Sequence, residues 1–179
     1  MISTRRSVLA AGAATLILPT FGTTPILPAA PAFAAADPRI VEWADLIPPG
    51  IPYPEITDDG EMDAANDTWA PKFDENATKL NEDLDGALIR MPGFIIPLEQ
   101  DSDGVTEFML VPYVGACIHV PPPPPNQLVV VTTETPWPED DLWDPVWVTG
   151  TMRTALQSTD IAQAGYALRA DAMETYEWK

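Results

Sequence analysis

The sequence predicts a mainly β protein, folded as a small closed or partly open, OB-like barrel that carries an irregular acidic N-terminal arm. Three observations lead to this prediction. From about residue 86 onward apolar residues alternate with period two, the alternating segments are short, and glycines mark their bends. Short, glycine-bent strands in a chain of ordinary domain length are typical of a barrel, with a β-sandwich as the alternative.

Residues 1–36 have the order of an export signal. They contain no acid and run from Arg5-Arg6 through the apolar stretch Val8–Leu18 into an alanine- and proline-rich end. The stretch around Arg5-Arg6 fits the twin-arginine pattern. Pro19 and Gly22 interrupt the apolar run well before the ~20 residues that a membrane anchor needs. We therefore expect cleavage near Asp37 and a soluble periplasmic protein.

Residues 37–85 form the predicted acidic wrapping arm. Pro48-Pro49-Gly50 and Pro52 exclude a long helix near its start, where Trp43 and Leu46 are expected to pin the arm to the domain. The spacing of apolar residues over Lys72–Leu84 predicts one short helix.

Residues 86–179 form the predicted barrel domain. Two of its segments, Gly86–Gly93 and Val146–Gly150, share alternating apolar residues that end in glycine, like bent OB strands. The tail over 160–176 suits either a strand or a helix, and we favour a strand from Ala164. The expected strands are Ala87–Met91, Phe94–Leu98, Glu107–Val111, Val114–Val120, Leu128–Thr133, Val146–Met152 and the tail.

The charge of the chain excludes several classes of partner. Removing residues 1–36 removes two of the 9 Lys and Arg but none of the 27 Asp and Glu, which leaves a formal charge of −20 on 143 residues. Such a surface repels phosphate backbones and anionic lipids, so we expect no nucleic-acid binding and no membrane insertion. A solvated acidic coat explains the charge more simply than a cation-binding surface.

The segment most suited to chemistry precedes five prolines. Cys117 and His119 are the single cysteine and the single histidine of the chain. Two residues apart in a strand, they would share one face, about 7 Å apart. Thiolate and imidazole favour zinc or copper. Glu99 is the expected third ligand, with Met91 and Met109 as further candidates on neighbouring strands.

Two other interpretations of Cys117 and His119 remain open. In the first, both are packing residues of a strand. In the second, Cys117 is a nucleophile with His119 as its base, although neighbours on one strand rarely point at each other. We lean against an enzyme, because no nucleophile elbow, phosphate loop or dinucleotide motif occurs in the sequence.

Tryptophans and acids of the C-terminal half are weaker candidates. Trp137, Trp143 and Trp147 could line a ligand groove, but packing is the commoner role of tryptophan. The acids Glu139-Asp140-Asp141 are most simply a solvated turn.

The central stretch resembles a known family. Met91–Glu99, Phe108–Gln127 with its Gly-Ala-Cys-Ile-His-Val-Pro core, and Val146–Gly150 are similar to an uncharacterised family of exported bacterial proteins that is known only as a domain of unknown function. The resemblance covers residues 85–155, and it implies a link to transporter operons, some of them zinc-responsive. No cysteine stands at the cleavage site, unlike in the lipoprotein members.

From these observations we expect a periplasmic metal-handling accessory of a transport system that binds zinc or copper through Cys117, His119 and Glu99. The alternative is a metal-free interaction module, in which a β edge or the proline-stiffened loop docks on an exported or membrane partner.

Overall fold

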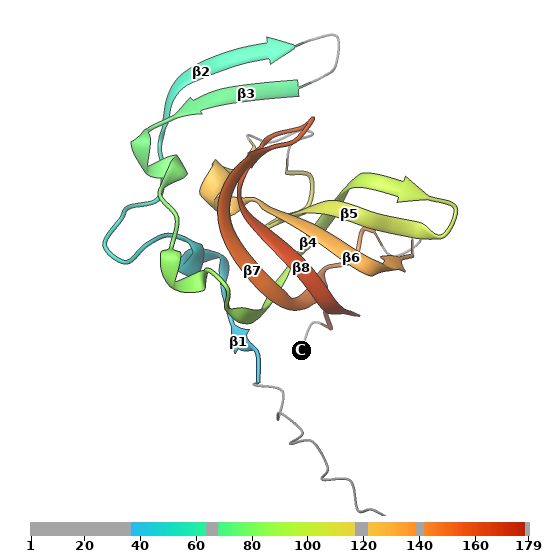
Figure 1. Cartoon of the computed structure of the whole chain (residues 1–179). Coiled ribbons are helices and arrows are strands. Elements are labelled where there is room, and N and C mark those ends of the chain that lie inside the picture. Colours follow the sequence, from blue (N-terminus) through green and yellow to red (C-terminus); the bar gives the residue numbers. More distant parts are fainter. Residues whose placement is uncertain (1–36, 64–67, 117–121, 139–141, 178–179) are drawn as a thin grey trace, which may run out of the picture. The chain divides into compact units, whose positions relative to one another are not determined.

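Five strands close into a barrel. The computed structural model describes residues 37–63, 68–116, 122–138 and 142–177, which belong to one compact unit, Ala35–Lys179. The strands run in the order β4-β5-β6-β8-β7, and pairing of β4 with β7 closes the sheet (Figure 1). Their bounds are β4 Leu88–Asp101, β5 Gly104–Val111, β6 Val129–Trp137, β7 Val146–Ser158 and β8 Gln163–Thr175. The predicted barrel and the C-terminal strand are confirmed.

Strand β4 closes the barrel because its two halves pair with different strands. Its first half, up to Gly93, pairs with β7, and its second half, from Phe94, pairs with β5. The sequence predicted two strands here, and the structure has one bent strand. A Cβ atom on Gly93 would lie 2.7 Å from Cγ of Leu110, so only glycine fits where the strand changes partners.

Glycine is also required where β7 passes β8. A Cβ atom on Gly150 would lie 2.0 Å from the carbonyl oxygen of Arg169, next to a register shift between the two strands. The main chain of β8 at Arg169 and Ala170 leaves no room for even one methyl group.

The strands bury apolar side chains on two sides of the sheet. Inside the barrel lies the main core, which includes Phe108, Leu110 and Val131. A second cluster, here called the outer cluster, covers the opposite face of β4, β5 and β6. Its fully buried members include Met109 and Val111, although they point away from the barrel interior. Strand β5 is therefore apolar on both faces, which explains why its sequence does not alternate.

The N-terminal arm contains more regular structure than its sequence predicts. Its elements are β1 Arg39–Ile40, η1 Trp43–Leu46, β2 Ile56–Asp63, β3 Thr68–Phe73, η2 Glu75–Thr78 and η3 Glu82–Leu84, where η denotes a 3₁₀ helix. β1 runs parallel to β4, and β2 and β3 form a separate hairpin.

The helix predicted over Lys72–Leu84 is wrong. Its first residues belong to β3, and the remainder splits into the two short turns η2 and η3. The side chains of Asp74 and Asn81 accept hydrogen bonds from the backbone N–H groups of Asn76 and Asp83, so each starts a new turn instead of continuing the previous one. The apolar spacing was correct as a burial pattern: Ala77 and Leu84 are buried.

Buried hydrogen bonds fasten the arm to the barrel. The hydroxyl of Tyr166 on β8 donates to the carbonyl oxygen of Leu46 and accepts from the backbone N–H of Asn81 at 2.7 Å. Nε2 of Gln127 donates to the carbonyl oxygen of Trp43 at 3.0 Å. Nδ2 of Asn126 donates to the carbonyl oxygen of Asn76 at 2.9 Å. These contacts join segments that lie 50 to 120 residues apart in the sequence.

The connection between β5 and β6 lies against the outer cluster. Val114 and Gly115 form a turn, so the strand predicted over Val114–Val120 is wrong at its start. The connection ends in a further 3₁₀ helix, η4 (Pro125–Gln127). Within the described residues, no helix is both long enough and apolar enough to cross a bilayer.

Candidate functional site

Cys117 and His119 lie outside the described residues, but the chain on either side of them is firmly packed. Ala116, which directly precedes Cys117, is fully buried in the outer cluster. Pro123 and Pro124, which follow the segment, are buried as well. Pro122 and Pro125 are half-buried, so the described part of the proline run packs on the domain while part of its surface stays accessible, and its role as a docking loop stays a prediction.

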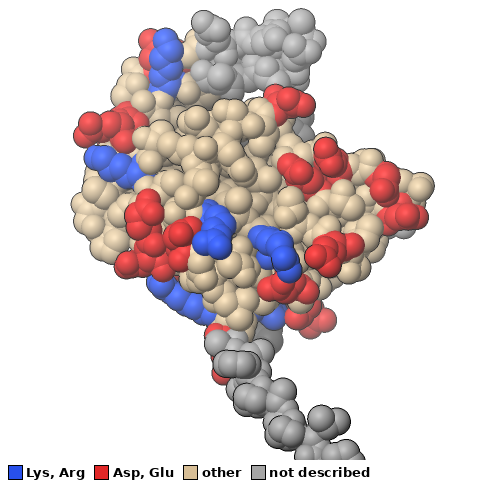
Figure 2. All heavy atoms as spheres, viewed as in Figure 1, with Lys and Arg blue, Asp and Glu red and all other residues tan. Residues whose placement is uncertain are grey.

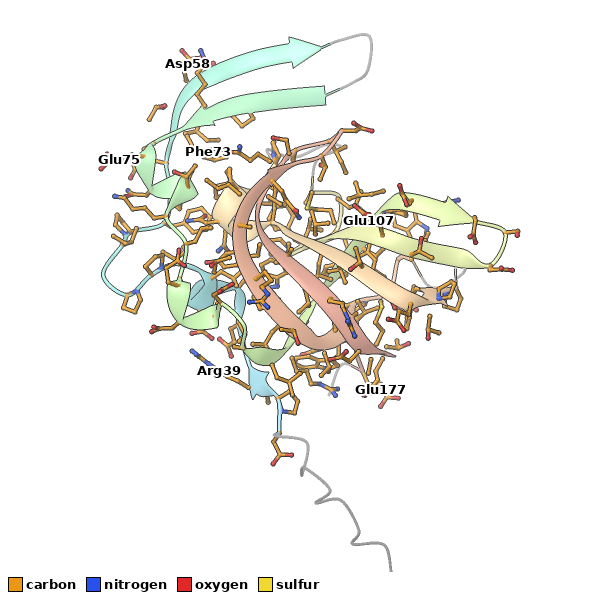
Figure 3. The ribbon with its side chains drawn as sticks, in the orientation of Figure 1. Arg39, Asp58, Phe73, Glu75, Glu107 and Glu177 are labelled. Atoms are coloured by element: carbon orange, nitrogen blue, oxygen red, sulfur yellow. The ribbon has the colours of Figure 1, made fainter. Side chains whose placement is uncertain are left out.

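Glu99, the expected third metal ligand, lies exposed near the end of β4. It stands directly opposite Glu107 of β5, which is labelled in Figure 3. Residues paired across antiparallel strands project on the same face, and like charges there repel each other. The two acids therefore occupy paired positions of β4 and β5, with a register shift on each side of Glu99.

Met91 and Met109, the two candidate metal-binding methionines, lie on opposite faces of the sheet. Met91 is fully buried in the barrel core, sealed among apolar side chains. Met109 lies in the outer cluster together with Ala116, and it shares the outward face of β5 with Glu107. Of the two thioethers, only that of Met109 shares a cluster with Ala116, the residue that precedes Cys117 in the sequence. The described part of the chain contains no group of three potential metal ligands.

Two apolar grooves flank Phe94 where β4 bends. The first groove has a volume of about 140 Å³ and lies on the outer cluster. Its wall includes Phe94, Ile96, Val111, Val114, Leu142 and Trp143. The second groove, also of about 140 Å³, is lined by Trp43, Pro92, Gly93, Phe94, Pro112, Pro145 and Tyr176. Both are walled by apolar or aromatic residues, and Phe94 contributes to both.

Exposed aromatic and aliphatic side chains border these grooves. Trp143 is 76% exposed and Val114 is 52% exposed. Tyr113 follows Pro112 of the second groove, and Tyr53 lies close to it: partial burial, and then the neighbouring Tyr113 hydroxyl, raise the pKa of Tyr53 above its usual value. The apolar surface therefore extends beyond the grooves.

The tryptophans predicted as groove or packing residues divide between the two roles. Trp143 lines the first groove. Trp137 packs partly buried against the barrel core. Trp147 stacks at 5.2 Å on Tyr176, with the guanidinium of Arg90 5.0 Å from its ring centre. The acids 139–141 lie outside the described residues.

Sequence reasoning missed the grooves as a combined feature. Their walls come from η1, β4, the β5–β6 and β6–β7 connections and the tail, so no single segment carries a pattern. The sequence features that could have indicated the grooves are an aromatic residue within two positions of a proline in two connections, Pro112-Tyr113 and Trp143-Asp144-Pro145. Among the described residues that line the two grooves, none is charged. On the face shown in Figure 2, by contrast, carboxylates gather over the β4–β5 hairpin and basic groups are few.

Comparison with known proteins identifies a matching protein family and a similar crystal structure. A family described as "Protein of unknown function (DUF3299)" matches residues 43–175. The crystal structure of a DUF3299 family protein from Pseudomonas aeruginosa PAO1 is 38% identical, with a TM-score of 0.67, and the match covers 79% of this chain and 98% of that one. Among curated proteins none matches. The resemblance to a family of unknown function is confirmed, while its link to transporter operons stays a prediction.

Proposed function

Because the chain belongs to the DUF3299 family, whose function is unknown, we propose a function from its own residues. The protein is a periplasmic metal-binding accessory of a transport system, exported by the twin-arginine route. It holds zinc or copper through Cys117 and His119, with help from Glu99. Its single thiol and single imidazole stand two residues apart in a segment with packed ends.

One observation carries the proposal. Ala116 packs into the same outer cluster as Met109, and Cys117 is the next residue along the chain. Ala116 is the last described residue before Cys117, and it is fully buried. The face of β5 that carries Met109 also carries Glu107, opposite Glu99. A thioether and two carboxylates thus belong to the outward face that continues into Ala116, and Cys117 and His119 would add a thiolate and an imidazole to them.

The donor set allows a choice between the two metals. Thiolate, thioether and imidazole together suit Cu(I), which prefers soft ligands. Thiolate, imidazole and a carboxylate suit zinc in a site with an open fourth position. Loss of metal in Met109→Leu would therefore favour copper, and loss in Glu99→Gln would favour zinc.

The test is metal analysis of the protein exported to and purified from the periplasm of cells grown in zinc- or copper-supplemented medium. We expect about one metal ion per protein, lost in Cys117→Ala and in His119→Ala. Glu134→Gln, which changes an exposed glutamate of β6, is the matched control and should keep its metal. Negligible metal in the unaltered protein, or equal metal in all variants, would refute the proposal.

A second candidate function is a metal-free interaction module. The apolar grooves beside Phe94 favour it, because apolar surface with exposed aromatics on a strongly charged protein is typical of binding sites. Capture of an exported partner by the Cys117→Ala variant as well as by the unaltered protein would support this function over the metal site.

A further inference from the structure

The two grooves are each the size of one ring. A cavity of about 150 Å³ lined by apolar side chains accommodates benzene, so the grooves, at about 140 Å³, can each receive a ring-sized apolar side chain. Phe94 lines both grooves. A single extended ligand could therefore fill the two in succession.

The second groove has the lining of a site for extended, proline-rich segments. Its wall combines the aromatic rings of Trp43, Phe94 and Tyr176 with three prolines. Aromatic-lined grooves bind polyproline II segments because such segments are already stiff and lose little entropy on binding. Prolines in the wall also lack N–H donors, which suits a ligand that is recognised by its rings more than by its main chain.

Negative charges beside the second groove favour a ligand whose ends are positively charged. Exposed carboxylates directly adjoin residues of the second groove in the sequence: Glu42 beside Trp43, Asp144 beside Pro145, and Glu177 beside Tyr176. The wall residues that the structure describes carry no charge. An apolar core with basic flanks is complementary to this arrangement, and acidic flanks would be repelled.

From these observations we infer that the grooves bind an extended proline-rich segment with lysine or arginine flanks, supplied by another exported protein. This inference rests on the second proposed function and is independent of the metal site. An anionic membrane and a second copy of this chain are the competing occupants, and the same experiment distinguishes them.

The test uses the full chain, exported and purified from the periplasm, and a fluorescent synthetic peptide with a Pro-x-x-Pro-x-x-Pro core and two lysines at each end. Fluorescence anisotropy should show saturable binding. Replacing the prolines by alanine, or the lysines by glutamate, should weaken binding about tenfold or more. Equal binding of the alanine peptide would overturn the inference, as would the absence of saturable binding.

Protein variants then locate the site. Trp143→Ala removes an exposed side chain of the first groove and should weaken binding about tenfold, as expected for an aromatic anchor. Leu156→Ala is the control, because Leu156 is also an exposed apolar residue, 47% accessible, but lies in neither groove. The substitutions Asp144→Lys and Glu177→Lys should each weaken the lysine-flanked peptide about two- to fivefold at low salt and strengthen the glutamate-flanked one. Equal effects of Trp143→Ala and Leu156→Ala would overturn the inference.

The remaining outcomes separate this inference from the function on which it rests. Binding to phosphatidylglycerol vesicles in place of the peptide, or self-association that Trp143→Ala abolishes, would assign the grooves to another occupant and overturn the inference. A captured partner whose binding survives Trp143→Ala would also overturn it, while the interaction function would stand.

Discussion

The hydroxyl of Tyr166 offers the sharpest test of how the arm is held. Tyr166→Phe keeps the ring and removes one oxygen. That oxygen is fully buried and bonds two backbone groups of the arm, the carbonyl of Leu46 and the N–H of Asn81. Its loss leaves both groups without this partner, away from water.

The expected loss of stability follows from those two contacts. Each hydrogen bond contributes about 1 kcal/mol net, and each buried group left unpaired costs about 1–3 kcal/mol. We expect the free energy of unfolding to fall by about 3 kcal/mol. For a domain of this size that corresponds to a decrease in Tm of about 6–12 °C. Tyr53→Phe is the control: its side chain belongs to a residue that is 56% exposed, and its effect should stay within about 0.5 kcal/mol.

The same hydroxyl predicts a pH dependence. Burial raises the pKa of Tyr166 from 10.0 to about 12; Glu82 adds to this increase, and the hydrogen bond from Asn81 opposes it. Between these two values the unfolded chain loses the proton while the folded protein keeps it, so stability falls as the pH rises. The stabilisation is complete below pH 10 and is lost toward pH 12. Two pKa units correspond to about 2–3 kcal/mol.

Urea unfolding followed by tryptophan fluorescence measures both effects. At pH 7 the unaltered protein should exceed Tyr166→Phe by about 3 kcal/mol, and near pH 11.5 most of that difference should be gone. Background titration of other groups affects both proteins equally. A difference below 0.5 kcal/mol at pH 7, or one that persists unchanged at pH 11.5, would show that this hydroxyl does not fasten the arm.

Two further predictions concern the barrel and export. Gly150→Ala should lower the free energy of unfolding by more than about 3 kcal/mol, because its Cβ would contact main chain at 2.0 Å. Gly50→Ala is the control: Gly50 has φ +84° but lies in open space, so its substitution should lower the free energy of unfolding by about 1 kcal/mol. Similar unfolding midpoints for the two variants would contradict the close contact. Arg5→Lys with Arg6→Lys should leave the precursor in the cytoplasm, as detected by cell fractionation and immunoblotting; undiminished periplasmic protein would exclude the twin-arginine route.

The sequence by itself determined most strands of the barrel, although it divided β4 in two and began a further strand where Val114 and Gly115 form a turn. Alternation of apolar residues is a local property, because side-chain direction depends on the strand itself, and the glycines that mark the bends, Gly93 and Gly150, are visible in the sequence. Cys117 and His119 could likewise be selected from the sequence, because each is the only residue of its kind.

Tertiary structure alone decided how the arm folds and where the grooves lie. The β2–β3 hairpin lies in an acidic stretch without clear alternation, and Asp74 and Asn81 divide a segment whose apolar spacing resembles a helix. The second groove joins Trp43, Phe94 and Tyr176, which lie up to 133 residues apart. Periodicity reports which side of its own strand a residue faces, whereas the closure of the barrel decides which distant segments meet, and that information is not contained in any one segment.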